Sequence, residues 1–213
     1  REVMEDELAL PVVPGEKTEG ERFPGADHTY TCETMMSDRK ALQAGTSHFL
    51  GQNFAKAFDI QFQSEAGQLE YAWTTSWGAS TRLIGALVMT HSDDDGLVLP
   101  PRVAPTQVVI LPLSNDQGRM DEILLPRARE VESRLGGVLG PRRVRVDTQF
   151  HLRPADRFFF HLQRGVPLRL ELGERELEEG TLRYVRRDTG EKGHFSLERA
   201  SEEVPALLGR IQR

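Results

Sequence analysis

The sequence contains a single cysteine, Cys32, in 213 residues. One thiol closes no intramolecular disulfide and builds no cysteine-rich zinc site, so the chain suits a reducing cytoplasm. The sequence also lacks any apolar run long enough for a membrane-spanning helix, and any charged start followed by an apolar stretch and a cleavage site. We therefore expect neither secretion nor membrane insertion, and we predict a soluble cytoplasmic protein.

Motifs that mark several enzyme classes are missing as well. There is no G-x-S-x-G nucleophile elbow, no Walker loop and no zinc-spaced group of histidines and cysteines. The acidic run SDDDG at 92–96 lacks the alternating spacing of a calcium loop, so we interpret it as a surface connection. The sequence thus predicts no resident metal and no tightly bound cofactor.

Charge divides the chain into two parts. Residues 1–102 hold 16 acidic and 8 basic residues, and residues 103–213 hold 17 and 19. The division falls in GLVLPPRVAP, where three prolines in six residues interrupt helix and sheet pairing. We predict two domains, 1–102 and 103–213, joined by a flexible seam near Pro100.

The spacing of apolar residues predicts an α+β arrangement in the first part and an α/β arrangement in the second. Short connections favour antiparallel pairing of the first three strands, and the second part is expected to form a mixed sheet flanked by helices. The expected strands are 28–36, 40–48, 69–77, 106–113, 142–147, 166–172 and 181–187. The expected helices are 48–58, 80–91, 121–135, 154–163 and a closing helix from Ala200.

Both ends of the chain are typical of interrupted helices. REVMEDELAL has the pattern of the last turns of a helix, and ASEEVPALLGRIQR stops without a glycine or proline terminator. We expect the sequence to be part of a longer protein.

The stretch ALQAGTSHFLGQNFAKAF at 41–58 gathers four hydrogen-bonding side chains, Gln43, Thr46, Ser47 and His48, ahead of a helical pattern. A strand meant only for a core would alternate apolar and polar residues. The stretch therefore indicates a ligand.

A second informative junction is TTSWGASTRLIGALVMTH at 74–91. Gly78 allows close approach, Ser80 can cap the following helix, and Arg82 lies in its first turn. A helix N-terminus beside a guanidinium stabilises an anion or a flat ring. The same pattern also fits an ordinary capped helix.

Together these segments closely resemble prolyl-tRNA synthetases of the archaeal and eukaryotic type. The resemblance is carried by KTEGERFPGADHTYTCETMM, ALQAGTSHFLGQNFAKAFDI and TTSWGASTRLIGALVMTH, and continues through RGVPLRLELGERELEEG and RRDTGEK. It implies that residues 1–102 form the C-terminal part of a class II catalytic domain, and 103–213 an anticodon-binding domain. Two class II signatures and the C-terminal domain fall outside the sequence, so we expect the isolated chain to be inactive.

The resemblance implies a proline–tRNA ligase that uses ATP with Mg²⁺, L-proline and tRNA(Pro). It also implies that the full-length enzyme is a homodimer. By similarity, Gln43, Thr46 and Arg82 bind ATP, and Arg82 is the catalytic residue that packs on adenine and offsets phosphate charge. The implied proline-binding residues are Phe23, His48, Ser76, Trp77 and Gly78. Core packing equally fits Phe23 and Trp77, and a helix-start histidine fits His48.

For the anticodon, the resemblance implies Arg164, Arg169 and Lys192. All other basic residues of the second part are arginines, which favour bidentate contact with phosphates and bases, although compositional bias or a solvated face explains this equally well. The sequence departs from the family at His161 and Leu162, where a Trp-Glu pair is usual. A noncatalytic tRNA- or nucleotide-binding relic is the alternative function.

Overall fold

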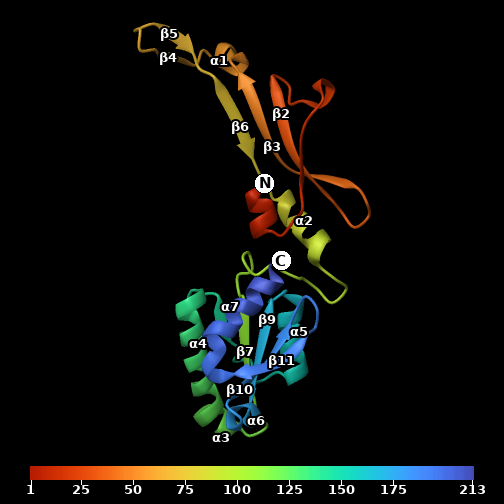
Figure 1. Ribbon diagram of the computed structural model, residues 1–213, viewed down its shortest axis with the longest axis vertical. Coiled ribbons are helices and arrows are strands. Elements are labelled where there is room, and N and C mark those ends of the chain that lie inside the picture. Colours follow the sequence, from red (N-terminus) through yellow and green to blue (C-terminus); the bar gives the residue numbers. More distant parts are fainter. The chain divides into compact units, whose positions relative to one another are not determined.

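The computed structural model describes residues 1–213, which form two compact units (Figure 1). The first unit comprises Arg1–Asp6 and Leu10–Thr90, and the second comprises Glu7–Ala9 and His91–Arg213. The boundary predicted between residues 102 and 103 lies inside the second unit. None of the helices combines the length and the apolar character needed to cross a membrane.

The first unit is built on a four-stranded sheet in the order β1-β2-β3-β6, with every neighbouring pair antiparallel. This confirms the predicted antiparallel sheet with helices. A separate hairpin pairs β4 with β5. The elements are β1 (Val13–Glu16), β2 (His28–Met35), β3 (Ala41–Gly51), β4 (Gln61–Gln63), β5 (Leu69–Tyr71), β6 (Thr74–Gly78), the helices α1 (Asn53–Ala57) and α2 (Arg82–His91), and the short turns η1 (Val3–Glu7) and η2 (Glu19–Glu21).

Two predictions for this unit were wrong in their bounds. The helix expected at 48–58 begins only at Asn53, because β3 continues to Gly51 and pairs with β2 on one side and β6 on the other. Ladder pairing on both edges outweighs the helical spacing of the side chains. The strand expected at 69–77 is divided into β5 and β6, which belong to different sheets.

The second unit is built on a five-stranded mixed sheet in the order β11-β10-β9-β7-β8. Strand β7 runs parallel to β8 and β9, whereas β10 is antiparallel to both of its neighbours. This confirms the predicted mixed sheet. The strands are β7 (Val108–Leu113), β8 (Val144–Val146), β9 (Leu168–Gly173), β10 (Thr181–Arg186) and β11 (Lys192–Ser196).

Helices cover both faces of this second sheet. The apolar stripes of α4 and α7 pack on one face in the main core, which includes Leu135, Ile110 and Leu207, all at most 1% exposed. The other face packs around Val109 and Phe158, the latter on α5. The helices and turns are α3 (Gln117–Arg119), η3 (Met120–Leu124), α4 (Leu125–Leu139), α5 (Pro154–Gln163), α6 (Glu174–Glu178), η4 (Leu197–Arg199) and α7 (Ala200–Ile211).

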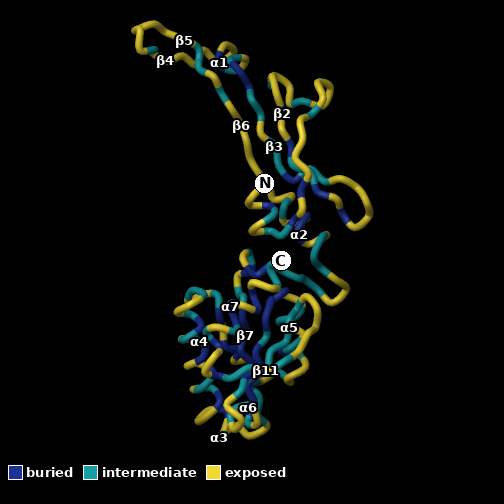
Figure 2. The backbone as a smooth tube through the Cα atoms, in the orientation of Figure 1, coloured by how far each residue is buried: buried dark blue, intermediate teal, exposed yellow.

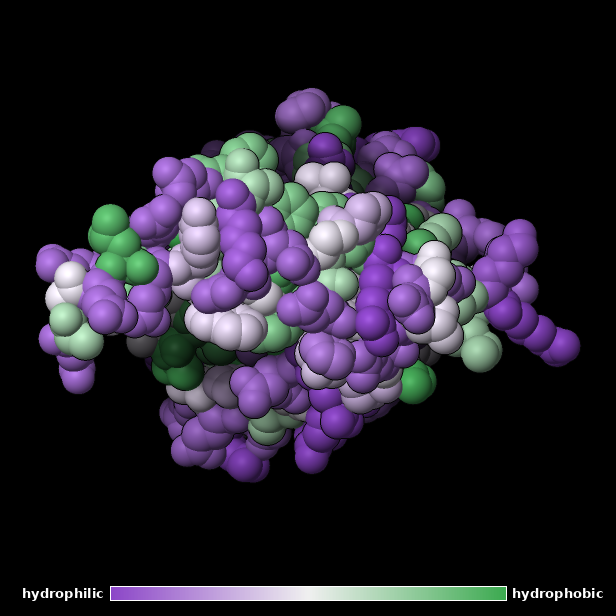
Figure 3. Space-filling view, turned by 90° about the horizontal axis from the view of Figure 1, so that it is seen from above, coloured by the Kyte–Doolittle hydropathy of each residue, from purple (hydrophilic) through white to green (hydrophobic).

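The two units differ in how much apolar surface they bury (Figure 2). The first unit has a small core around Met4, Val12 and Ala44. It also exposes large apolar side chains, among them Trp77 at 78% and Leu69 at 72%. On the face of the molecule seen in Figure 3, hydrophobic residues lie among hydrophilic ones. The second unit therefore holds most of the chain's packed core.

The proline-rich segment 97–106 is packed rather than flexible. Pro100 and Pro101 are buried, and Ala104 is fully buried. The Gln107 amide donates to the Pro101 carbonyl at 2.8 Å, and Arg143 donates to the Ala104 carbonyl at 2.6 Å. Buried prolines and side-chain hydrogen bonds thus anchor this segment to the second unit, whereas the sequence predicted a flexible seam near Pro100.

Limited proteolysis with an unspecific protease should accordingly spare residues 97–106 while cutting the exposed turn 64–68 between β4 and β5. Buried, hydrogen-bonded backbone opens rarely, whereas an exposed turn is open to a protease at once. Mass spectrometry of the early fragments provides the measurement. Cleavage within 97–106 as early as within 64–68 would contradict the packed arrangement.

Candidate functional site

A β-bulge in β3 determines which side chains share one face of the first sheet. Cys32 pairs with Gly45, but the next residue of β2, Glu33, pairs with Gln43, so that Ala44 is the extra residue. Side chains alternate along a strand, and a bulge shifts that alternation by one residue. Gln43 therefore shares a face with Thr46 and His48, although simple alternation would place it opposite them.

The neighbouring strand β6 adds polar groups to the same face. Thr46 pairs with Gly78, and His48 pairs with Ser76. Gly78 presents no side chain there and leaves the backbone open. Two strands, β3 and β6, thus contribute to one polar strip.

His48 is held in place by two neighbours. Its Nδ1 lies 3.0 Å from the hydroxyl of Thr29, which is 1% exposed, and its ring lies 4.9 Å from the ring of Phe23. The Thr29 hydroxyl also accepts the backbone N–H of Phe23 at 3.4 Å. The structure therefore brings Phe23 and His48 together in one aromatic wall.

Arg82 lies beside the same strip. Its guanidinium donates to the carbonyl of Gln43 at 3.3 Å, and its backbone N–H donates to the Ser80 hydroxyl at 3.3 Å. The Ser80 cap confirms the predicted helix start. Lys17 donates to the Gln43 side chain at 2.6 Å and places a second cation there, for which the sequence carried no signal.

Trp77 is not part of this cluster. It pairs with Ser47 and so points to the face opposite His48 and Ser76. There it lines a cavity of about 740 Å³ together with Tyr30 and Leu83. The expectation that Trp77 backs the same wall as His48 was wrong, because the period of two along β6 turns its side chain away.

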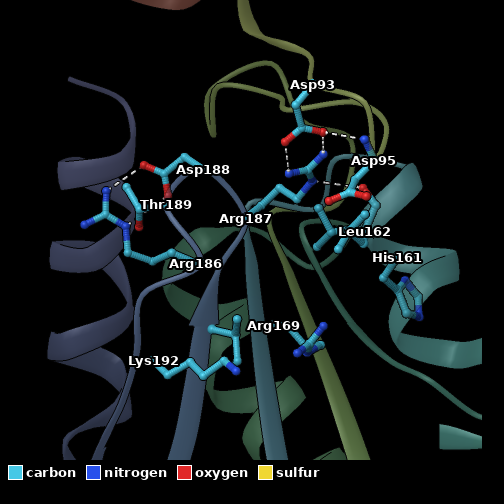
Figure 4. Close-up of a pocket in the computed structure, with 13 residues that line it drawn as sticks. Asp93, Asp95, His161, Leu162, Arg169, Arg186, Arg187, Asp188, Thr189 and Lys192 are labelled. Atoms are coloured by element: carbon cyan, nitrogen blue, oxygen red, sulfur yellow. Dashed lines mark hydrogen bonds and ion pairs between the residues drawn. The ribbon is translucent and has the colours of Figure 1, made fainter. Parts of the chain in front are cut away.

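In the second unit, two of the predicted RNA-binding residues lie in one row across the sheet. Arg169 on β9 pairs with Val185 on β10, and Val185 pairs with Lys192 on β11, so all three side chains lie on the α5 face. They line a cavity of about 500 Å³ (Figure 4). Its other lining residues are Asp93, Asp95, His161, Leu162, Val166, Arg186, Arg187, Asp188, Thr189 and Gly190.

The third predicted residue, Arg164, does not line this cavity. Its guanidinium lies 3.5 Å from the centre of the Phe160 ring and donates to the Phe160 carbonyl at 3.4 Å. The cavity wall includes Leu162, which offers an apolar surface where the resemblance leads us to expect a glutamate. The structure thus joins Arg169 with Lys192 and leaves Arg164 outside the cavity.

Ion pairs organise the rim of the cavity. Arg187 donates to both carboxylate oxygens of Asp93, at 2.6 and 2.7 Å, and Arg186 donates to Asp188 at 2.6 and 3.0 Å. The hydrogen bond from Arg187 holds the pKa of the Asp93 carboxyl at about 2, below its ordinary value of 3.8. The acidic run is thus an exposed connection, as predicted, that the Arg187–Asp93 ion pair fixes within the second unit. No group of three or more histidine, cysteine or carboxylate side chains in residues 1–213 is placed to hold a metal ion.

A buried charge network lies next to the cavity, under α5. The Asp147 side chain is fully buried. Its carboxylate accepts hydrogen bonds from Arg157 Nε at 2.8 Å and from His161 Nε2 at 2.5 Å. Burial alone would raise the pKa of the Asp147 carboxyl, but hydrogen bonds from His161, the Gln149 backbone and Arg157 outweigh it and hold that pKa below its ordinary range. This network fixes His161 in the cavity wall. Sequence reasoning missed it because no local spacing rule predicts that Asp147, which follows β8, meets the buried side of α5.

Comparison with known proteins agrees with this division of the chain. Residues 107–207 match the family described as "Anticodon binding domain". The chain is 52% identical to proline–tRNA ligase 2 of Anaeromyxobacter dehalogenans over 98% of its own length and 41% of that protein. It is also 50% identical to proline–tRNA ligase of Christiangramia forsetii and 52% identical to that of Salinibacter ruber.

These alignments cover 99% and 98% of this chain but 42% of each of the two relatives. The chain therefore spans about two fifths of the length of the curated relatives it matches. The comparisons agree with the resemblance to prolyl-tRNA synthetases but do not test its archaeal and eukaryotic subtype. That subtype stays a prediction.

Proposed function

Because the chain is homologous over its whole length to prolyl-tRNA synthetases, we propose that it serves in ATP-dependent activation of L-proline and its transfer to tRNA(Pro). The observation that carries this proposal is the β3 bulge, which gathers Gln43, Thr46 and His48 on one face beside Arg82. A strand without the bulge would place Gln43 on the opposite face. In this proposal the first unit contributes to the active site, and the second unit binds RNA.

Proline activation requires attack of the proline carboxylate on the α-phosphate of ATP, which enters as a substrate complex with Mg²⁺. The protein's role in such a reaction is to position the reactants and offset developing negative charge. Arg82 offers a flat cation for adenine stacking and for phosphate charge, while Gln43 and Thr46 supply hydrogen-bonding groups. The Lys17 ammonium beside Gln43 adds positive charge to the same region.

Proline needs a pocket that is apolar toward its ring and polar toward its amine and carboxylate. In this proposal Phe23 and His48 receive the ring, and the Thr29 hydroxyl keeps the imidazole in a fixed orientation. Ser76 and the open backbone at Gly78 face the amine and the carboxylate. Trp77 is left out of the pocket because it lies on the other face of the sheet.

The second unit is proposed to bind the anticodon of tRNA(Pro). Single-stranded RNA is recognised by cations toward phosphates and by polar groups toward splayed bases. The cavity next to α5 offers Arg169 and Lys192 in one row, with the apolar side chain of Val185 between them. We further propose a cytoplasmic homodimer for the whole enzyme. The alternative, a noncatalytic RNA- or nucleotide-binding protein, is favoured by no specific contact in the structure.

RNA binding by the 213-residue chain tests this proposal. A stem-loop carrying the tRNA(Pro) anticodon should bind, and Lys192→Ala should weaken binding about 5- to 30-fold, since a cation that faces the RNA is lost. The slope of log affinity against log salt concentration should become shallower by the amount that corresponds to about one phosphate contact. Lys56→Ala, in the first unit, provides the matched control. Equal effects of both substitutions, or no binding by the unaltered chain, would refute the anticodon role.

A further inference from the structure

The acidic loop 92–96 forms a fixed wall of the cavity in the second unit. Asp93 is held by Arg187 through two hydrogen bonds, and its Oδ1 also accepts the backbone N–H of Gly96 at 3.2 Å. Gly96 adopts φ +139, and a Cβ there would lie 2.6 Å from the Cα of Gln163, so the loop backbone packs directly on the end of α5. These contacts fix the loop backbone beside the cavity, which a second carboxylate of the loop also lines.

That carboxylate belongs to Asp95. Its backbone N–H donates to Asp93 at 3.0 Å, while its exposed side chain lines the cavity and makes no hydrogen bond or ion pair. The two other carboxylates that line the cavity are neutralised by Arg187 and Arg186. Among the cations, Lys192 makes no ion pair. Among its charged side chains, the cavity therefore presents one carboxylate, Asp95, and one ammonium, Lys192, without an ion-pair partner.

Apolar side chains line the same cavity as these two charges. Leu162, Val166 and Val185 line the cavity. Figure 4 shows Asp95 beside Leu162 at the rim, whereas Lys192 lies with Arg169 on the strands. Such a cavity fits a flat ring that has N–H donors on one edge and acceptors elsewhere.

We propose that Asp95 reads a guanine base of the bound RNA, with Lys192 directed to the acceptors of the same base. This inference rests on the anticodon role proposed above. Guanine has two adjacent donors, N1–H and the exocyclic amine, which match both oxygens of one carboxylate, and it carries acceptors at O6 and N7. Leu162, Val166 and Val185 then face its ring.

The other bases meet Asp95 less favourably. Adenine and cytosine each present a ring-nitrogen acceptor next to their amine, which would oppose the negative carboxylate, and uracil offers a single N–H. An acceptor facing a carboxylate leaves both groups without a hydrogen bond. Asp95 thus acts as a specificity-determining residue rather than as a general contributor to RNA affinity.

The test compares two stem-loop RNAs, one with the guanines of the tRNA(Pro) anticodon and one with inosine in their place. Inosine lacks only the exocyclic amine. The unaltered chain should bind the guanine RNA about 10-fold or more tightly, and Asp95→Asn should reduce this ratio to about 2-fold or less. The ratio is compared because removing a negative charge strengthens binding to any RNA.

Asp94→Asn is the matched control, because it removes the same charge from the same loop at a side chain that does not line the cavity. It should keep the guanine preference, and circular dichroism should show both variants folded. If the unaltered chain prefers guanine and Asp95→Asn retains that preference, or if the unaltered chain binds both RNAs equally, the role of Asp95 is overturned while RNA binding stands. If the unaltered chain binds neither RNA, the anticodon role and this inference both fall.

Discussion

Replacing Arg82 with alanine should lower the efficiency of proline-dependent ATP–pyrophosphate exchange by roughly 30- to 1,000-fold. The physical reason is the loss of a stacked, charge-assisted contact to ATP, which costs on the order of 2–4 kcal/mol in the transition state. Folding should change little, because Arg82 is exposed and makes one weak hydrogen bond to the Gln43 backbone at 3.3 Å. The measurement is made in an active proline–tRNA ligase that carries this sequence, with ATP and proline varied separately.

Companion variants separate charge from geometry. Arg82→Lys keeps the positive charge but loses the planar guanidinium, so its activity should fall between that of the unaltered enzyme and that of Arg82→Ala. Gln43→Ala should impair the use of ATP, whereas Ser76→Ala should act chiefly through proline. Arg39→Ala, in the turn between β2 and β3, is the control and should leave exchange unchanged. Unaltered efficiency for ATP in Arg82→Ala would refute the proposed site.

Replacing Arg157 with leucine should lower the free energy of unfolding of the second unit by about 3–5 kcal/mol, since a buried carboxylate then loses its cation. The side chains of Arg157 and Asp147 are 3% and 0% exposed. Arg157 also donates to the carbonyl of Pro112 at 3.2 Å and thereby joins the end of β7 to α5. Chemical denaturation followed by circular dichroism gives the measurement.

Arg153→Leu, at the residue that precedes the same helix, is the matched control. Arg153 donates to Asp156 at a similar distance, 2.9 Å, but both side chains are exposed, at 83% and 44%. Water and salt screen such a pair, so the unfolding midpoint should hardly move. Equal midpoint shifts for Arg157→Leu and Arg153→Leu would show that the buried ion pair of Asp147 stabilises the second unit no more than an exposed ion pair does.

The same network predicts how stability depends on pH. The native pKa of Asp147 lies below its ordinary value of 3.8, so the unfolded chain binds the proton more readily. The stabilisation is therefore complete above about pH 4 and is lost as the pH falls toward the native pKa. Asn in place of Asp147 should flatten this acid limb of the stability curve.

Local patterns in the sequence determined the types of most elements. Apolar spacing predicted α2, α5 and α7, and the β-branched run at 106–113 predicted β7, since burial of one helical stripe or one strand requires these patterns. Apolar spacing and short connections also indicated a fold with an antiparallel sheet followed by a mixed one. Short elements such as β11 and α6 were missed because a few residues carry too little pattern.

Tertiary structure decided which of these residues meet. The bulge at Ala44 placed Gln43 with Thr46, and strand alternation turned Trp77 away from His48, whereas the residue types alone allowed either arrangement. Likewise, the acidic loop joined the second unit because Arg187, 94 residues later, neutralises Asp93. Residue type and spacing along the chain determine local structure, but the pairing of distant charges and strands depends on the packed fold, where burial and register select among the partners that the sequence offers.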